Sequence, residues 1–473
     1  MVCTYFLENA VKHSKHIAAS LALSASVILS AIDVKAQENS AEPKLESKSM
    51  PKRRIDVPVF SNSNWANPSD SFDANTQDWH SVNQLLGKAN DFCGITLGLD
   101  DYLLGRIGLF AFGSALLLPP NYFSHELAHS YYSRWNGKDA FDVSFGFFKN
   151  TVEPINFGRH VGYVTSSGAY GIEEFGLGFM RVSNTTDASL FKNKNDLSAY
   201  TFNNVAGLNQ QELNVAYLHE QFAKENKIFF DQSVNFILNR FFTLGYVAFG
   251  NSLPVEKVED LYALSAVSDS AGYRAGLKLK GHNISQDNLL LESIIPVVLS
   301  FDTFNSFKSI ENYLGGDRRT TTPKSISLGS CDLLFPLVSH YFTPDGGFYN
   351  ATLFLNPNDK SVSLLEGQIG VDTKFVSGGD LNVLRFGGKV HGIKLAEKMP
   401  FILSPFAYVN VSKAPLEYKG VLTGVDISVQ LSKAPFSCSL NGQIEYSNND
   451  LIETIIKREK EQGSFSLGVS LWF

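Results

Sequence analysis

Cysteine is scarce in this chain, with 4 residues in 473. Cys93, Cys331 and Cys438 lie far apart, so they form neither a disulfide framework nor the closely spaced cysteine pair of a structural zinc site. Positive charge is also limited, because 40 Lys and Arg stand against 47 Asp and Glu and leave a net charge of −7. Without a dense basic patch, the sequence gives no support for nucleic acid as a partner.

Long uninterrupted apolar runs are missing as well. The first apolar stretch, 17–32, is short and rich in serine. The basic segment KHSKH precedes it, and small residues that end at Ala36 follow it. This arrangement predicts a signal peptide, 1–36, and therefore export, with a weak N-terminal membrane anchor as the alternative. Later apolar runs of helical length are short or interrupted by charged and amide residues, which indicates buried helices of a compact domain.

Composition divides the rest of the chain into three parts. Residues 37–79 are polar and lack helical or strand periodicity, which predicts a linker. Residues 80–316 carry helical apolar runs with short alternating stretches between them, so we expect a mainly helical domain with a small inserted sheet. Residues 325–473 hold about eight alternating segments separated by turn sequences such as TPDGG and NPNDK, which are typical of antiparallel strands.

Two features of 325–473 favour a membrane barrel over a soluble sandwich, whose strands would also alternate. The strands are near ten residues long, enough to cross a bilayer when tilted, and polar residues such as Glu366 and Gln368 recur on the face opposite Ile369. The 37 phenylalanines also suit a lipid-facing band with aromatic girdles. The predicted fold class is α+β, with a mainly helical domain, 80–316, followed by an antiparallel β-barrel of about eight strands.

The last ten residues, SFSLGVSLWF, alternate apolar and polar side chains and end on Trp472 and Phe473. This ending resembles the C-terminal assembly signal of Gram-negative outer-membrane barrels. The resemblance covers only the terminal strand, and the alternative is an ordinary last strand of a soluble sheet. It implies the outer membrane of a Gram-negative bacterium, contact with outer-membrane lipid, insertion by the barrel assembly machinery, and a helical domain in the periplasm.

The stretch NYFSHELAHSYYSRW, 121–135, contains His-Glu-x-x-His. Two prolines precede it and an Asn-Gly pair follows, which predicts one helix with a clear start and stop. On that helix His125 and His129 lie one turn apart on the same face, so both imidazoles can reach one metal ion. The stretch resembles the active-site helix of zincin metallopeptidases, which implies a Zn²⁺ ion with His125 and His129 as ligands and Glu126 as general base.

A catalytic zinc normally takes a third protein ligand. The extension found in metzincins is absent, because Tyr132 and Trp135 stand where its glycine and third histidine would be. A glutamate from a later helix, as in gluzincins, is the remaining common arrangement, and Glu212 is the preferred candidate, since Gly207 before it permits a close approach of helices. His219 could be a further ligand or a transition-state donor. The other candidates are Glu153, Glu173, Glu174 and Asp269.

Two functions remain open at this point. The first is a zinc-dependent peptidase of the bacterial envelope, anchored by the C-terminal barrel and acting on an envelope protein or peptide. The second is a structural or transport outer-membrane barrel with a helical plug and a non-catalytic metal site. The helix around Glu126, with its clear start and stop signals, favours the enzyme.

Overall fold

The computed structural model describes most of the chain from Arg53 onward. The described residues are 53–61, 72–135, 140–145, 155–157, 160–162, 178–182, 194–249, 269–317, 319–357, 362–373, 382–394, 401–412, 420–432, 437–448 and 461–472. The predicted signal peptide, 1–36, and the terminal Phe473 lie outside them.

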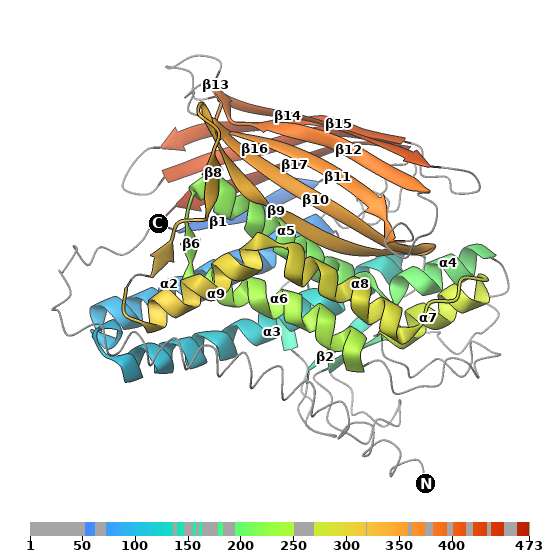
Figure 1. The fold of residues 1–473 in the computed structure, drawn as a ribbon, viewed down its shortest axis with the longest axis horizontal. Coiled ribbons are helices and arrows are strands. Elements are labelled where there is room, and N and C mark those ends of the chain that lie inside the picture. The colour runs from blue at the N-terminus through green and yellow to red at the C-terminus, as the bar shows by residue number, and fades with distance from the viewer. Residues whose placement is uncertain are drawn as a thin grey trace, which may run out of the picture.

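The C-terminal part of the chain forms one large antiparallel sheet (Figure 1). Its 11 strands follow the order β1-β17-β16-β15-β14-β12-β11-β10-β9-β8, with β13 paired to β14. Their bounds are β1 Arg54–Ser61, β8 Ser325–Ser327, β9 Cys331–Thr343, β10 Gly346–Pro357, β11 Leu364–Asp372, β12 Val383–His391, β13 Ile393–Lys394, β14 Phe401–Ser412, β15 Gly420–Ser432, β16 Ser437–Asn448 and β17 Glu461–Trp472. The α+β class is confirmed, but among the described residues the sheet is not closed into a barrel.

The long strands are joined as successive hairpins, as their alternation and turn sequences predict. The TPDGG sequence is one example, because Thr343 pairs with Gly346 and the two residues between them make the turn from β9 to β10. Gly346 has a φ of 140°, a conformation that side chains disfavour and glycine adopts freely. A short turn of this kind fixes the register of the two strands.

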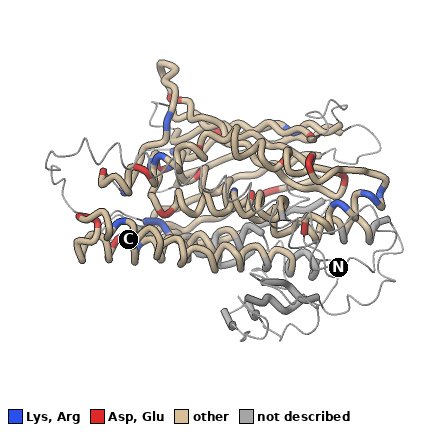
Figure 2. Tube along the Cα trace, turned by 60° about the horizontal axis from the view of Figure 1, so that its bottom comes forward, with Lys and Arg blue, Asp and Glu red and all other residues tan. Residues whose placement is uncertain are grey.

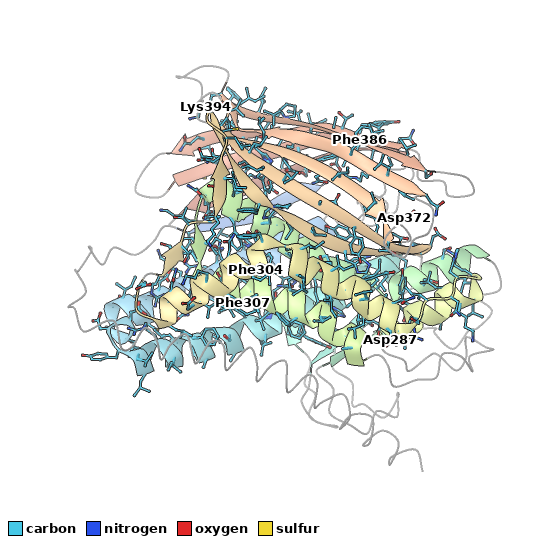
Figure 3. The ribbon with its side chains drawn as sticks, in the orientation of Figure 1. Asp287, Phe304, Phe307, Asp372, Phe386 and Lys394 are labelled. Atoms are coloured by element: carbon cyan, nitrogen blue, oxygen red, sulfur yellow. The ribbon has the colours of Figure 1, made fainter. Side chains whose placement is uncertain are left out.

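The two faces of the sheet have opposite polarity. On β14 the exposed side chains include Phe401, Val409 and Val411, whereas Asn410 and Ser412 between and beside them are buried. Figure 2 shows long uncharged stretches along the strands and the helices, and Phe386 stands on the outer face of the sheet in Figure 3. The alternation read from the sequence is therefore present, with apolar side chains outward and, on the inner face of β14, polar side chains next to Phe406 and Tyr408.

The N-terminal two thirds of the described chain is mainly helical. The helices are α2 Phe72–Thr96, η2 Leu99–Asp101, α3 Leu103–Trp135, α4 Lys194–Asn203, α5 Ala206–Glu225, α6 Phe230–Phe249, α7 Asp269–Leu279, α8 Gln286–Leu299 and α9 Phe301–Leu314. Three two-stranded ribbons accompany them, formed by β2 Ala140–Phe145 with β5 Gly178–Val182, by β3 Ile155–Phe157 with β4 His160–Gly162, and by β6 Ile228–Phe229 with β7 Thr320–Thr321. Small strands among the helices were expected from the sequence.

Helix α5 is the centre of the molecule. Its described side chains are mostly buried, and it contacts α2, α3 and α6 on the helical side and β9 on the sheet side (Figure 1). An apolar core shared by both layers includes Leu208 of α5, Tyr273 of α7 and Phe342 of β9. The helices and the sheet therefore form one packed body.

Two expectations from the sequence need correction. The predicted linker, 37–79, contains β1 and the first turns of α2, and β1 is ordered because it pairs along its length with β17. The helix with His-Glu-x-x-His does not start at the two prolines, since α3 begins at Leu103 and runs through Pro119 and Pro120. Each proline removes a backbone hydrogen bond, and packing of α3 against α2, α5 and α6 helps to offset that loss.

The expectation of fully buried helices also needs correction. Among the described residues one helical stretch, Leu103–His129 of α3, is long and apolar enough to cross a membrane. Helices α8 and α9, which are bent by 61° relative to each other, would make a second span if they are counted as one. Only 22% of the α3 window is buried. Much of this helix therefore carries its apolar side chains on the surface.

Helical side chains occupy the free edge of β9. Short β8 covers only residues 332–334 of this strand. Beyond residue 334, every second residue of β9 points its backbone groups away from β10. These backbone groups form hydrogen bonds with side chains of the helices. These bonds join Val338 to Ser300 and Arg240, His340 to Glu212, and Phe342 to Asn209, over 2.6–3.3 Å. The helices thus take the place of a neighbouring strand.

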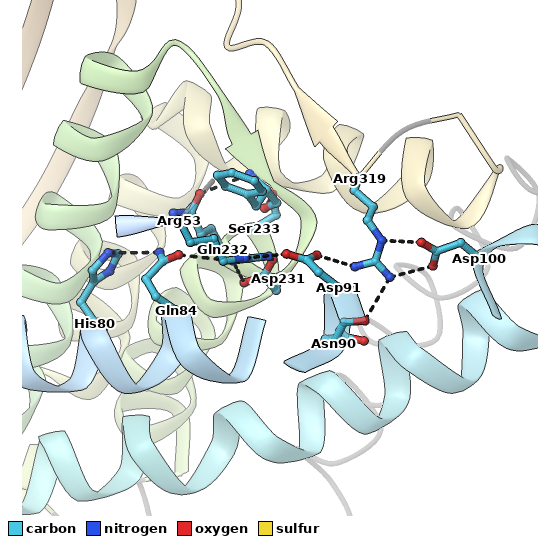
Figure 4. Close-up of polar contacts among 11 residues, drawn as sticks. Arg53, His80, Gln84, Asn90, Asp91, Asp100, Asp231, Gln232, Ser233 and Arg319 are labelled. Carbon is cyan, nitrogen blue, oxygen red and sulfur yellow. Dashed lines mark hydrogen bonds and ion pairs between the residues drawn. The ribbon is translucent and has the colours of Figure 1, made fainter. Parts of the chain in front are cut away.

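A chain of buried ion pairs fixes the other edge (Figure 4). Arg53, immediately before β1, contacts Asp91 of α2 and Asp231 of α6, each at 2.7 Å, and Asp91 also receives Arg319 at 2.6 Å. Arg319 continues the chain to Asp100, with an Nη2–Oδ1 distance of 2.7 Å. Burial alone would lower the pKa of Arg53, but Asp231 and Asp91 raise it above its ordinary value. The start of β1 is thereby attached to two helices.

Replacing Arg53 with Ala should lower the free energy of unfolding by about 3–5 kcal/mol, because it leaves buried carboxylates without their partner. Denaturant unfolding in detergent measures this loss. Lys308→Ala is the control, since its ion pair with Glu311 is exposed and should contribute under about 0.5 kcal/mol. Equal effects of the two substitutions would contradict a fixing role for the buried chain.

Candidate metal centre

Helix α3 places His125 and His129 side by side in the interior. They are one turn apart, their side chains are 1% and 6% exposed, and their Nε2 atoms are 3.3 Å from each other. Two imidazole nitrogens at this distance repel each other when both present lone pairs, unless a cation or a proton lies between them. The geometry predicted from the i, i+4 spacing is therefore present.

Asp269, the first residue of α7, brings a carboxylate to the same point. Its Oδ2 atom lies 2.9 Å from Nε2 of His125 and 3.4 Å from Nε2 of His129. Ligand atoms about 2.0–2.1 Å from a tetrahedral zinc ion stand roughly 3.3 Å apart, so the three observed separations fit one such ion. This is the one cluster of three or more His, Cys, Asp or Glu ligand atoms found among the described residues.

Neighbouring groups orient both histidines. Nδ1 of His129 donates to the backbone carbonyl of Asn203 at 2.6 Å, which places the ring proton on Nδ1 and leaves Nε2 free to bind a metal. The ring of His125 stacks on Tyr246, with centroids 4.6 Å apart and planes 13° from parallel. Its ring also lies against Gly207, where an added Cβ would come within 2.4 Å of Nε2. Gly207 therefore allows the close approach that the sequence predicts.

The histidines keep Asp269 ionised. Burial alone would raise the pKa of Asp269, but in the metal-free protein charge on His129 and hydrogen bonds from both histidines hold that pKa well below its usual range. A deprotonated carboxylate is the form that binds metal. With two imidazoles beside it, the donor set suits zinc.

Glu126 follows His125 directly on α3. Its side chain lies outside the part of the chain that the structure describes, as do Glu153, Glu173 and Glu174, three of the alternative ligands. The assignment of Glu126 as general base therefore remains a prediction from the sequence.

Glu212, the preferred third ligand, is engaged elsewhere. Its carboxylate lies 2.6 Å from Nη1 of Arg240 and accepts the backbone N–H of His340. Arg240 is 1% exposed, and a guanidinium buried this deeply needs a carboxylate partner. The structure thus brings Asp269, one of the alternatives, to the two histidines in place of Glu212.

His219 is also paired away from the centre. Its Nδ1 atom contacts the Asp302 carboxylate, and its ring packs against Phe354 of β10. His219 is therefore not brought to His125 and His129, and its proposed role as ligand or transition-state donor has no support from its position.

A signal for Asp269 is present in the sequence but is weak. Gly272 and Gly276 follow it at four-residue spacing, and a Cβ on either would come within 2.2 Å of Asn204 or Thr201 of the α4 region. Close packing of α7 on this region brings Asp269 and the Asn203 carbonyl to α3 together. Small residues four apart after an acidic residue are common, so this pattern alone could not identify the ligand.

The chain matches no protein-family model, and neither the curated proteins nor the solved structures give a match. The metal centre therefore rests on its own geometry.

Asp269→Asn should weaken zinc binding by more than the roughly 10–100-fold typical of lost supporting groups, because it removes an anionic ligand.

Glu212→Gln should keep stoichiometric zinc but lose about 3–5 kcal/mol of stability, because it leaves Arg240 without a counter-charge. Metal analysis beside denaturant unfolding distinguishes the two. Zinc lost with Glu212→Gln and kept with Asp269→Asn would restore Glu212 as the ligand.

Gly207→Ala should reduce zinc affinity by about 10–100-fold, the loss typical when a group that positions a ligand is disturbed, because the new methyl group would displace the His125 ring. Competition with a chromophoric chelator measures the affinity. Gly108→Ala on α3 is the matched control, since a Cβ there meets no atom within 4 Å. The same affinity in both variants would show that Gly207 does not position His125.

Proposed function

We propose that the protein is a zinc-dependent peptidase of the bacterial envelope. The observation that supports this is the convergence of His125, His129 and Asp269 on one point, with Glu126 next in the chain to the first ligand. Three protein ligands including two histidines are the usual set for a catalytic zinc, which keeps a further position for water or substrate. The substrate is an envelope protein or peptide.

Different residues of the chain have different roles in the proposed reaction. His125, His129 and Asp269 hold the ion, while the Asn203 carbonyl and the Tyr246 ring keep the imidazoles in place. A zinc ion bound there supplies a Lewis acid that polarises the scissile carbonyl. Glu126 takes a proton from the attacking water and delivers it to the leaving amine. The buried position of both histidines limits competing bulk water around the ligands.

The large sheet supplies the proposed anchor in the outer membrane. Its long strands have 9–13 residues, enough to cross a bilayer when tilted. The outward side chains of several strands are exposed and apolar, among them Leu353, Ile369, Phe386 and Ile444. Outward apolar and inward polar faces are the arrangement that lipid favours.

The second candidate, a barrel with a helical plug, has one observation in its favour. Helix α5 packs between β9 and the other helices and carries the buried polar side chains Asn209, Gln210 and Asn214. It fills space that an open channel would leave for water. A non-catalytic metal site in such a plug would account for the His-His-Asp cluster but not for a glutamate next to its first ligand, so we favour the peptidase.

Glu126→Gln separates the two candidates. The variant keeps the size of the side chain and should fold and bind zinc as the wild type does, while peptide cleavage should fall by about 10²–10⁴-fold. Cleavage of envelope proteins is measured beside zinc content in one detergent preparation. Glu311→Gln on α9 makes the same chemical change far from the ligands and should leave cleavage unaltered.

Two results would contradict the peptidase. One is undiminished cleavage by Glu126→Gln, which would remove the general base. The other is full zinc occupancy with no cleavage of envelope proteins by the wild type, which would favour the plug with a structural metal site.

A further inference from the structure

Helix α3 has a continuous apolar stripe on its exposed side. The exposed positions between Leu104 and Leu118 follow the helical period of three and four. They are Leu104, Ile107, Gly108, Ala111, Phe112, Ala115 and Leu118. Leu104 is 83% exposed and Phe112 57%, so these side chains do not pack on the rest of the chain. At 1.5 Å per residue the stripe extends for roughly 21 Å.

Helices α2 and α8 repeat the pattern. On α2, Leu85, Ala89 and Phe92 are exposed at intervals of four and three residues. On α8, Leu291 and Ile294 are exposed, as are the last two residues of the helix, Val298 and Leu299. None of these positions carries a charge.

The inner faces of the helices bury many polar side chains beside the apolar core. The buried polar side chains of α2, α5, α6 and α9 include Gln84, Asp91, Asn209, Gln210, Glu212, Asn239, Arg240, Asp302 and Ser306. A helix on a water-exposed surface has the opposite arrangement, with its apolar stripe toward the core. The helical layer therefore combines apolar side chains on its surface with an interior that holds many polar groups beside its apolar clusters.

The helices also close the space between the two ends of the sheet. Helix α2 packs on β1 at one end, and α5, α8 and α9 pack on β9 near the other (Figure 1). Backbone groups of β9 that no strand covers are bonded by Ser300, Arg240, Glu212 and Asn209. A hydrocarbon environment requires every backbone polar group to be bonded within the protein, and these side chains meet that requirement at Val338, His340 and Phe342 of β9.

We infer that α2, α3 and α8 contact the hydrocarbon of the same bilayer as the sheet, so that strands and helices together form one lipid-facing wall. This inference rests on the proposed membrane placement of the sheet and replaces a periplasmic location for the helical layer. A protein partner would cover one patch, whereas apolar stripes on three helices continue the apolar outer face of the sheet. Lipid covers all of them, and the zinc ligands then lie inside the wall.

The test is the accessibility of nitroxide labels in liposomes of phosphatidylethanolamine and phosphatidylglycerol. Single cysteines replace Phe112, Val298, Phe386 or Asn283 in a background whose four native cysteines are alanine. Phe386 reports on the sheet, and Asn283, exposed in the polar loop before α8, reports on water. Labels at Phe112 and Val298 should show the high oxygen and low nickel-complex relaxation of Phe386, with a severalfold higher ratio than Asn283.

The outcomes are separable. Strong nickel relaxation at Phe112 and Val298 would place the helices in water. Shielding of both positions from oxygen and from the nickel complex would place a protein partner over them. Either result would overturn the inference. A lipid-exposed Phe386 in that case would leave the sheet in the membrane, whereas a water-exposed Phe386 would overturn the membrane placement altogether. Cleavage of envelope proteins, measured beside zinc content in the same samples, reports independently on the peptidase.

Discussion

The buried ion pair between Glu212 and Arg240 connects the helical layer to the sheet. It joins α5 to α6, and both residues also bond the uncovered edge of β9, Arg240 through the Val338 carbonyl and Glu212 through the His340 N–H. Because both side chains are almost fully buried, neither can lose the other without leaving a bare charge in the interior. The pair thereby fixes α5 against the sheet, and α5 in turn presents Gly207 to the His125 ring.

This constraint accounts for the division of roles among the acidic residues. Glu212 compensates a buried arginine, and Asp91 and Asp231 compensate Arg53 in the same way at the other end of the sheet. Among the described residues, Asp269 is the carboxylate that lies within ligand distance of both imidazoles. A carboxylate that neutralises a buried guanidinium is not available to a metal, which accounts for Glu212 not serving as a ligand. A polar interior also suits a body whose outer surface is apolar.

The sequence predicted much of this arrangement because the relevant patterns are local. Strand alternation predicted the eight long strands of the sheet, and the i, i+4 spacing predicted the two histidines of the His-His-Asp cluster. What it could not give depends on contacts between distant segments. The strand β1 is a short alternating segment inside a polar stretch of the sequence. Its partner strand β17 lies more than 400 residues later in the chain, so the pairing could not be read from the local sequence. The prediction of Glu212 as third ligand failed for the same reason, because Glu212 pairs with Arg240, 28 residues later in the chain.

The central claim is that one zinc ion binds to His125, His129 and Asp269. X-ray absorption at the zinc edge, on protein loaded with one equivalent, measures this directly. The account predicts a shell of nitrogen and oxygen atoms only, at about 2.0–2.1 Å, with the outer scattering of two imidazole rings. Sulfur in the shell, or a water-like shell without imidazole scattering, would show that the zinc binds elsewhere and would contradict the account.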